Sequence, residues 1–190
     1  MIYLASSSPR RAELLQQIGL DFEVLHVNID ESIYPEEKPA DYVCRMARSK
    51  AESAVRDNAI NSQSDTVIAA DTIVSIDDKI IGKPGDQSQC RCILSQLSGR
   101  RHRVMSAVAL FNRQKLDLKL SENLVWFRVI DDAEIADYCA SGEPMDKAGA
   151  YGIQGRAAIF IKHLEGSYSS VMGLPLYETD QLMRQAGIKI

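Results

Sequence analysis

The segment 66–76, TVIAADTIVSI, constrains the fold of this chain more than any other stretch. Its apolar and β-branched residues form a run whose length and composition are typical of a buried strand. Asp71 stands in the middle, although a buried carboxylate is unfavourable unless it is paired, hydrogen-bonded or bound to a metal. Asp71 therefore either caps a turn at a strand end or bulge, or lies at the floor of a cleft as a general base, a metal ligand or both.

The composition is that of an ordinary globular domain. The chain has 190 residues, 45% of them hydrophobic and 25% charged, which suffices for one sizeable domain or two small lobes. A net charge of −4 argues against a dedicated nucleic-acid-binding or membrane-surface protein. No window approaches a membrane span, and we expect no secretory signal.

The four cysteines include no CxxC pair. Cys90 and Cys92 alone are a weak metal signal, so we expect reduced thiols that pack in the interior or are incidental. Because reduced thiols are typical of a cytosolic protein, we expect a cytoplasmic location.

A short strand followed by a helix is predicted at the start of the chain. Ser8 as N-cap, Pro9 at the first helical position and Gly19 beyond the last turn delimit the helix. Arg10 and Arg11 lie in its first turn, where the helix dipole disfavours cations. Both arginines could simply be solvated. Free amides, serine hydroxyls and two guanidinium groups also make an anion site, and the three consecutive serines favour phosphate binding.

A second helix is predicted over residues 41–56, and its apolar stripe includes a lysine. Lysine is almost never fully buried without a partner. Lys50 is therefore either a snorkelling stem at the edge of the core or a cation that points into a cleft to meet an anion. Arg45 lies off the stripe, and we expect it to be solvated. The turn before the helix holds Asp30 and Glu31, an acidic pair that by itself is typical of a solvated loop.

Later stretches carry cationic or glycine-rich signals. Lys83, held extended by the proline that follows it, is a candidate cationic contact. The basic run 100–103 is typical of a solvated strand start. Residues 141–155 contain four glycines and little periodicity, which indicates either disorder or a binding loop. Tyr151 and Gln154 within this loop suit a flat ligand, and the amide of Gln154 could recognise a base edge.

The order of elements predicts the fold class. Strands and helices alternate early, long antiparallel strands dominate the middle, and a further strand is predicted over residues 157–163. This order indicates an α/β fold in which residues 1–190 form a single domain, with a mixed sheet and a cleft between two lobes.

Six short segments spread over nearly the whole chain carry a family resemblance. They are LASSSPRRAELL, ARSKA, AADTIV, GKP, DKAGAYGIQG and GLPLYET. In this order they resemble the Maf family of nucleoside triphosphate pyrophosphatases. The resemblance implies an elongated mixed β-sheet flanked by helices, with two lobes and a central cleft, similar in shape to the inosine triphosphate pyrophosphatases.

The resemblance also implies roles for single residues. Arg10, Thr72 and Gln154 match the subgroup that acts on dTTP and UTP, whereas the subgroup that acts on 7-methyl-GTP has, for example, SDQ in place of ADT. Asp71 would be the proton acceptor. The residues expected to contact metal are Glu31 and Asp71, and those expected to contact phosphate are Ser8, Arg11, Lys50 and Lys83.

The expected reaction is attack of water on the α-phosphate of dTTP or UTP, which gives the monophosphate and pyrophosphate. A divalent cation, Mg²⁺ or else Mn²⁺, would be held by Glu31 and Asp71. The expected partners are the nucleoside triphosphate and a second copy of the chain, since dimers are common in the family, without membrane or nucleic acid. Two alternatives remain open: a 7-methyl-GTP pyrophosphatase, and a non-catalytic nucleotide-binding regulator of cell division and septum formation.

Overall fold

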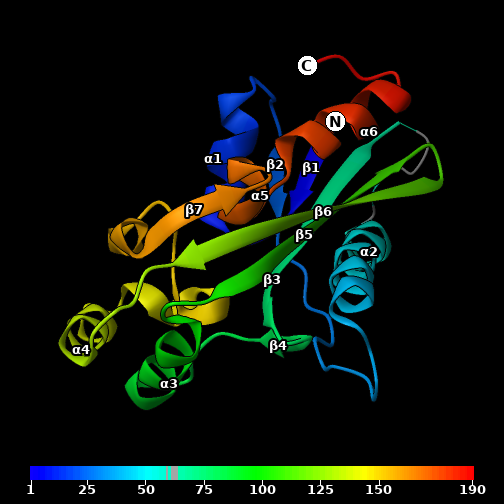
Figure 1. The fold of residues 1–190 in the computed structure, drawn as a ribbon. Helices are drawn as coiled ribbons and strands as arrows, with labels where there is room; N and C mark the ends of the chain where they lie inside the picture. The colour runs from blue at the N-terminus through cyan, green and yellow to red at the C-terminus, as the bar shows by residue number, and fades with distance from the viewer. Residues whose placement is uncertain (59, 61–63) are drawn as a thin grey trace. The chain divides into compact units, whose positions relative to one another are not determined.

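The chain forms two compact units in a computed structural model that describes residues 1–58, 60 and 64–190 (Figure 1). Unit 1 consists of Met1–Thr72, Ser106–Ser121 and Gly173–Ile190, and unit 2 consists of Ile73–Met105 and Glu122–Met172. Within the described residues, no helix combines the length and the apolar character that a bilayer crossing requires.

Strands pair into a mixed sheet in the order β2-β1-β3-β5-β6-β7, and β4 pairs with β3. The strands are β1 (Ile2–Ala5), β2 (Glu23–Leu25), β3 (Thr66–Ile76), β4 (Lys79–Ile81), β5 (Arg101–Asn112), β6 (Lys115–Phe127) and β7 (Ile161–Glu165). β1 runs parallel to β2 and β3, whereas β4 is antiparallel to β3 and β7 is antiparallel to β6. The predicted α/β class with a mixed sheet is therefore confirmed, and β3 has the predicted bounds.

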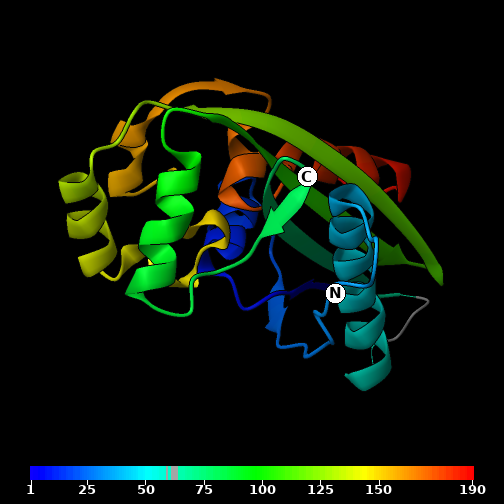
Figure 2. The ribbon, with the colours of Figure 1, turned by 60° about the horizontal axis from the view of Figure 1, so that its bottom comes forward.

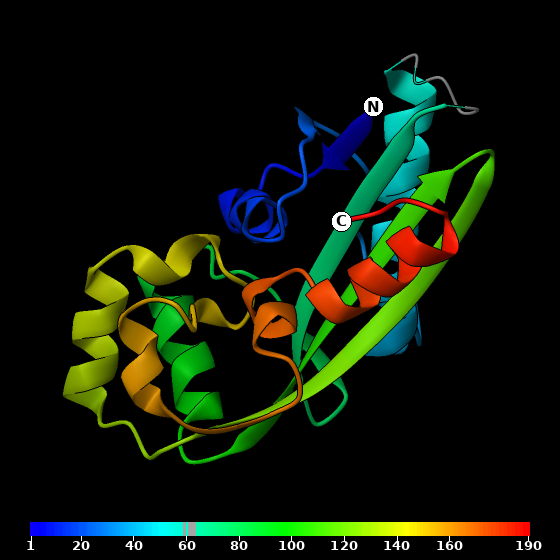
Figure 3. The same cartoon turned by 90° about the horizontal axis from the view of Figure 1, so that it is seen from above.

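Helices flank the strands in both units. Those of unit 1 are α1 (Pro9–Gln17), α2 (Pro39–Asp57) and α6 (Leu176–Gln185). Those of unit 2 are α3 (Gln87–Leu97), α4 (Asp132–Ala140) and α5 (Tyr168–Met172), with the 3-10 turns η1 (Glu143–Asp146), η2 (Ala148–Ala150) and η3 (Arg156–Phe160). In unit 1, α2 and α6 lie on opposite faces of the strands (Figures 2 and 3).

Local chemistry explains where most helices begin and where the hairpins turn. Pro9 and Pro39 occupy first helical turns, so α2 begins two residues earlier than predicted. Asp131 and Glu134 form a capping box at the start of α4. The two-residue turns 77–78 and 113–114 place every residue at positive φ, as the hairpin turn between twisted strands requires.

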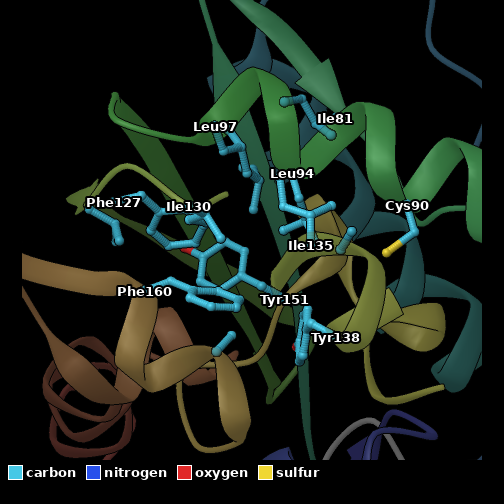
Figure 4. Packing of buried hydrophobic residues seen from close by; sticks show 14 of the residues in the cluster. Ile81, Cys90, Leu94, Leu97, Phe127, Ile130, Ile135, Tyr138, Tyr151 and Phe160 are labelled. Carbon is cyan, nitrogen blue, oxygen red and sulfur yellow. The ribbon is translucent and has the colours of Figure 1, made fainter. Parts of the chain in front are cut away.

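Unit 2 has an aromatic and aliphatic core between its helices and strands (Figure 4). The rings of Phe127 and Tyr151 lie 4.8 Å apart in an edge-to-face arrangement, and those of Tyr138 and Phe160 lie 5.4 Å apart. α3 and α4 pack side by side in this unit (Figures 1 and 2).

A disulfide joins α3 to α4, and the prediction of four reduced thiols is wrong. Cys90 and Cys139, both fully buried, form the bond across 49 residues of sequence, whereas Cys44 and Cys92 take no part in a disulfide. The sequence offered no spacing signal for this pair, because the two cysteines meet only when the helices pack.

The late part of the chain differs from the prediction. Where a strand was expected over residues 157–163, a 3-10 turn comes first and β7 begins only at Ile161. The glycine-rich residues 141–155 are well-defined turns, not a disordered segment.

Candidate active site

An ammonium group lies between two carboxylates in unit 1. Lys50 Nζ, on α2, donates a hydrogen bond of 2.7 Å to Oδ1 of Asp71 in the middle of β3. The same nitrogen lies 2.8 Å from Oε1 of Glu31. The side chains of Lys50 and Asp71 are each only 13% exposed, whereas that of Glu31 is 55% exposed. Lys50 is therefore a cation that pairs with carboxylates, as one of the two interpretations predicts. Asp71 lies within β3, so the interpretation that it caps a turn at a strand end is wrong.

The loop that carries Glu31 is tied to α2 by two side chains. Tyr42 Oη donates a hydrogen bond of 2.9 Å to the carbonyl oxygen of Glu31, and Arg45 Nη2 donates one of 2.8 Å to that of Ser32. Arg45 also forms a two-pronged ion pair with Glu37, so the prediction that Arg45 is solvated is wrong. Burial, followed by the nearby carboxylates of Asp71 and Glu31, raises the pKa of Tyr42 to about 12. These contacts hold Glu31 on the same side of α2 as Lys50.

Arg11 is fixed by three hydrogen bonds at the start of α1. Its Nε donates to the carbonyl oxygen of Gly173 at 2.8 Å, its Nη1 to Ser6 Oγ at 3.1 Å and its Nη2 to Thr72 Oγ1 at 3.4 Å. Burial lowers the pKa of Arg11, and the negative charge of Asp71 opposes that shift. A partly buried guanidinium held in this way keeps its charge and its direction, which suits it to bind an anion.

Ser8 and Arg10 occupy the helix start as predicted. Ser8 is the N-cap of α1, but its side chain makes no capping hydrogen bond. Its backbone N–H donates instead to Ser6 Oγ at 3.2 Å. Ser6 was expected only as one of the three consecutive serines, and Ser106, a serine inside the apolar strand β5, was not predicted at all. A buried polar residue within an apolar run is the signal that singled out Asp71, and it would have found Ser106.

The remaining predicted site residues, Lys83 and Gln154, belong to unit 2, and both are exposed. Lys83 follows β4, next to Gly82, whose carbonyl oxygen accepts a hydrogen bond of 3.1 Å from the N–H of Gly149. Gly149 has φ +72, and a Cβ there would come within 2.7 Å of Val74 Cγ2, so only glycine fits this close approach. The glycine-rich loop is thereby attached to the segment that carries Lys83.

Tyr151 does not offer a surface to a flat ligand, and that prediction is wrong. The ring is buried in the core of unit 2, and its Oη lies 2.8 Å from Nε2 of the buried His102. Burial raises the pKa of Tyr151. Tyr151 therefore supports the glycine-rich loop from the inside.

Two arginines of the basic run 100–103 form ion pairs with the turn that follows β3. Arg100 Nη2 lies 2.8 Å from Asp77 Oδ2, and Arg103 forms an ion pair with Asp78. These exposed pairs leave the run little net positive charge for a nucleic acid. The run leads into β5, which begins at Arg101, as the strand-start interpretation predicts.

The Maf-like protein family model matches residues 1–186 of the chain. The chain belongs to the Maf family. This Maf protein is 48% identical over 190 residues to a dTTP/UTP pyrophosphatase from Chromobacterium violaceum, covering 100% of this chain and 96% of the relative. It is 50% identical over 196 residues to a dTTP/UTP pyrophosphatase from Aromatoleum aromaticum, covering 98% of this chain and 95% of the relative.

A solved structure resembles the fold of this Maf protein. A HAM1 protein from Coxiella burnetii matches with a TM-score of 0.52 at 15% identity, covering 97% of this chain and 98% of the other. At that identity the likeness concerns the fold alone. It agrees with the α/β architecture that the sequence predicts.

Proposed function

We propose that this Maf protein is a nucleoside triphosphate pyrophosphatase that hydrolyses dTTP and UTP to the monophosphate and pyrophosphate. The observation that carries the proposal is the largely buried carboxylate of Asp71, which shares the ammonium group of Lys50 with Glu31. The names of the full-length relatives support the choice of substrate. Cationic groups near one acid suit a reaction that separates two phosphate groups.

Asp71 is the proposed proton acceptor. A water molecule attacks the α-phosphorus, the bond from that phosphorus to the bridging oxygen breaks, and pyrophosphate leaves with the bond electrons. The proton of the water passes to a carboxylate oxygen of Asp71. Lys50 holds that carboxylate in place without substrate, and its ammonium is near enough to serve phosphate oxygens once substrate is bound.

The residues at this site fit a divalent cation. Within the described residues no group of three or more His, Cys, Asp or Glu side chains could hold a metal ion. Nevertheless, Asp71 Oδ1 and Glu31 Oε1 lie 2.7 and 2.8 Å from the same nitrogen, Lys50 Nζ. The two carboxylates therefore already share one cationic group. Two carboxylates suit Mg²⁺ or Mn²⁺, which keep several waters and phosphate oxygens as further ligands. Such an ion, when bound, would lower the pKa of the attacking water and neutralise phosphate charge.

The other predicted residues are proposed to bind and select the nucleotide. Arg10, Thr72 and Gln154 select the pyrimidine, and Gln154, exposed and able both to donate and to accept, suits a base edge. Phosphate is bound by Ser8, Arg11, Lys50 and Lys83. Arg11 has the strongest support, because its guanidinium is already fixed in direction.

The test is a pyrophosphate-release panel over dTTP, UTP, CTP, GTP and 7-methyl-GTP with Mg²⁺. Release should be fastest with dTTP and UTP, and Asp71→Asn, which keeps the shape but not the basicity, should lose most of it. Asp57→Asn, on the exposed end of α2, is a matched control expected to leave the rates unchanged. Preference for 7-methyl-GTP, near-normal turnover by Asp71→Asn, or UTP binding without release would each reject the proposal.

The oligomeric state is a further proposal that rests on the resemblance, whereas the cytoplasmic location was expected from reduced thiols. We propose a homodimer and a cytoplasmic enzyme. The disulfide between Cys90 and Cys139 removes one argument for the cytoplasm, since that argument used reduced thiols. Sedimentation velocity at micromolar concentration tests the dimer, and a single monomeric species would reject it.

A further inference from the structure

The hydroxyl of Thr72 has three hydrogen-bond partners, all within unit 1. Thr72 Oγ1 lies 2.8 Å from Ser106 Oγ, 3.2 Å from the carbonyl oxygen of Gly173 and 3.4 Å from Nη2 of Arg11. Ser106 is fully buried. This cluster joins β3, β5, the start of α1 and the segment before α6.

The chemistry of the partners fixes the direction of each bond. A hydroxyl has one hydrogen to donate and two lone pairs to accept with. A guanidinium can only donate, so Thr72 accepts from Arg11, and a carbonyl oxygen can only accept, so Thr72 donates to Gly173. Ser106 must then be the donor to Thr72. The hydroxyl of Thr72 has no bonding capacity left for a nucleotide.

Arg11 is the group that this arrangement holds. A guanidinium has five N–H groups, and three of those of Arg11 donate hydrogen bonds to Gly173, Ser6 and Thr72. Among the described residues the other two, one on each terminal nitrogen, have no partner. The carbonyl of Gly173 accepts from both Arg11 and Thr72, and φ of +125 at Gly173 is a conformation that glycine alone adopts readily.

We propose that Ser106 is a further positioning residue of the reaction, and that Ser106 and Thr72 act as one unit that directs Arg11 toward the triphosphate. Thr72 thus acts on the triphosphate through Arg11 and does not touch the base, unlike the base-selecting role that the resemblance implies for it. The inference rests on the proposed function, because it takes Arg11 as a phosphate ligand.

The test compares Ser106→Ala, Thr72→Val, Thr72→Ser and the double variant Ser106→Ala/Thr72→Val. KM for UTP should rise about tenfold in each of the two hydroxyl-deleting single variants, the size of one lost hydrogen bond to a charged group, with kcat little changed. KM of the double variant should be no higher than that of either single variant, because the two hydroxyl groups act as one unit. Thr72→Ser, which keeps the hydroxyl, should behave as the wild type. Because Arg11 is proposed to bind phosphate, which every nucleoside triphosphate carries, the preference for UTP over 7-methyl-GTP should stay the same in both single variants.

The control is Ser53→Ala, which deletes a buried hydroxyl of unit 1 whose partner is Asp57, and it should leave KM unchanged. If Thr72→Val changes the preference while Ser106→Ala does not, Thr72 contacts the base and the inference fails. It also fails if Ser106→Ala leaves KM unaltered. Calorimetry with inorganic tripolyphosphate measures the same loss of affinity without turnover. A protein that does not hydrolyse UTP but shows this loss would reject the proposed function and retain the positioning role.

Discussion

Lys50 occupies a place on α2 that an apolar residue would normally fill. The helix buries Val43, Met46, Ala47 and Ala54 on the same stripe. Removing a cation from water is costly, and the cost is offset here by the carboxylate of Asp71 at 2.7 Å. Each of the two charges needs the other, so a change at either one affects both folding and chemistry.

Substitution of Lys50 should change both the free energy of unfolding and the rate of pyrophosphate release. Lys50→Met keeps the length of the side chain but leaves Asp71 as an unpaired, mostly buried carboxylate. We expect a loss of about 2 kcal/mol in the free energy of unfolding, and a large loss of pyrophosphate release. Urea unfolding at pH 7.5 and the release assay measure the two quantities.

A double variant provides the control. Lys50→Met/Asp71→Asn replaces the unpaired charge with a neutral amide and should regain most of the stability while remaining inactive. If Lys50→Met is as stable as the wild type, the pair does not stabilise the fold. If the double variant is active, Asp71 is not the proton acceptor.

His102 is a second buried titratable group, in the core of unit 2. Its Nε2 bonds to Tyr151 Oη, its ring meets Phe127 edge to face at 4.9 Å, and no described residue bonds to its Nδ1. Burial lowers the pKa of His102 from 6.5 to about 4. The native protein therefore keeps this imidazole neutral at pH values where the unfolded chain protonates it.

The pKa difference predicts a pH dependence of stability. Between pH 6.5 and 4 the unfolded state binds a proton that the native state does not, so stability falls as the pH falls through this window. The full effect is about 3 kcal/mol. Urea unfolding at pH 7.5, 6.0 and 4.5 measures the slope. Because carboxylates add to the slope at the acid end, His102→Phe is compared at each pH. An equal slope in the variant would contradict the role of His102.

At the scale of elements, the bond between Cys90 and Cys139 fixes α3 to α4. Closing a loop of this length restricts the unfolded chain, so reduction should lower the free energy of unfolding by about 2–4 kcal/mol. Urea unfolding with and without dithiothreitol tests this, and thiol titration in denaturant without reductant should count two of the four cysteines. Cys92→Ser should not change the effect of reductant. Four titratable thiols would show that the bond is absent.

Elements with local signals could be predicted, and those made by tertiary contact could not. β3 follows from an apolar run and has its predicted bounds, and the helix predicted over residues 41–56 from its apolar stripe is found as Pro39–Asp57. The turns of residues 141–155 depend on distant partners, such as Val74 against Gly149. No local pattern encodes those partners. The sequence therefore marks the loop as unusual but does not predict its conformation.

At the scale of the whole molecule, the same limit applies to the candidate site. Asp71 and Lys50 each stood out as polar residues among apolar ones, but their pairing across 21 positions is a property of the packed fold. The roles of Ser106 and Tyr42 emerge only once β5 and the loop before α2 have found their neighbours. Residue chemistry is therefore readable from the sequence, whereas the network that directs it is not.

Substrate binding should stabilise the fold, since groups from α1, α2 and β3 would hold a triphosphate together. A UTP analogue with a methylene bridge between its α- and β-phosphates resists hydrolysis and keeps the charges. At a concentration 100 times its Kd it should add about 2.7 kcal/mol to the free energy of unfolding. For a chain of this length that corresponds to a rise in Tm of about 5 °C or more.

The dependence of this rise on metal and on phosphate number identifies what is bound. If Asp71 and Glu31 hold a divalent ion, EDTA should abolish most of the rise, because the triphosphate then meets two carboxylates without a cation between them. UMP lacks the phosphates that Arg11 and Lys50 are proposed to bind, so it should give little shift at the same concentration. If the rise in Tm persists in EDTA, the nucleotide is bound by the arginine and lysine side chains without a metal ion. Equal shifts with UMP and the analogue would mean that the phosphate groups are not what the protein recognises.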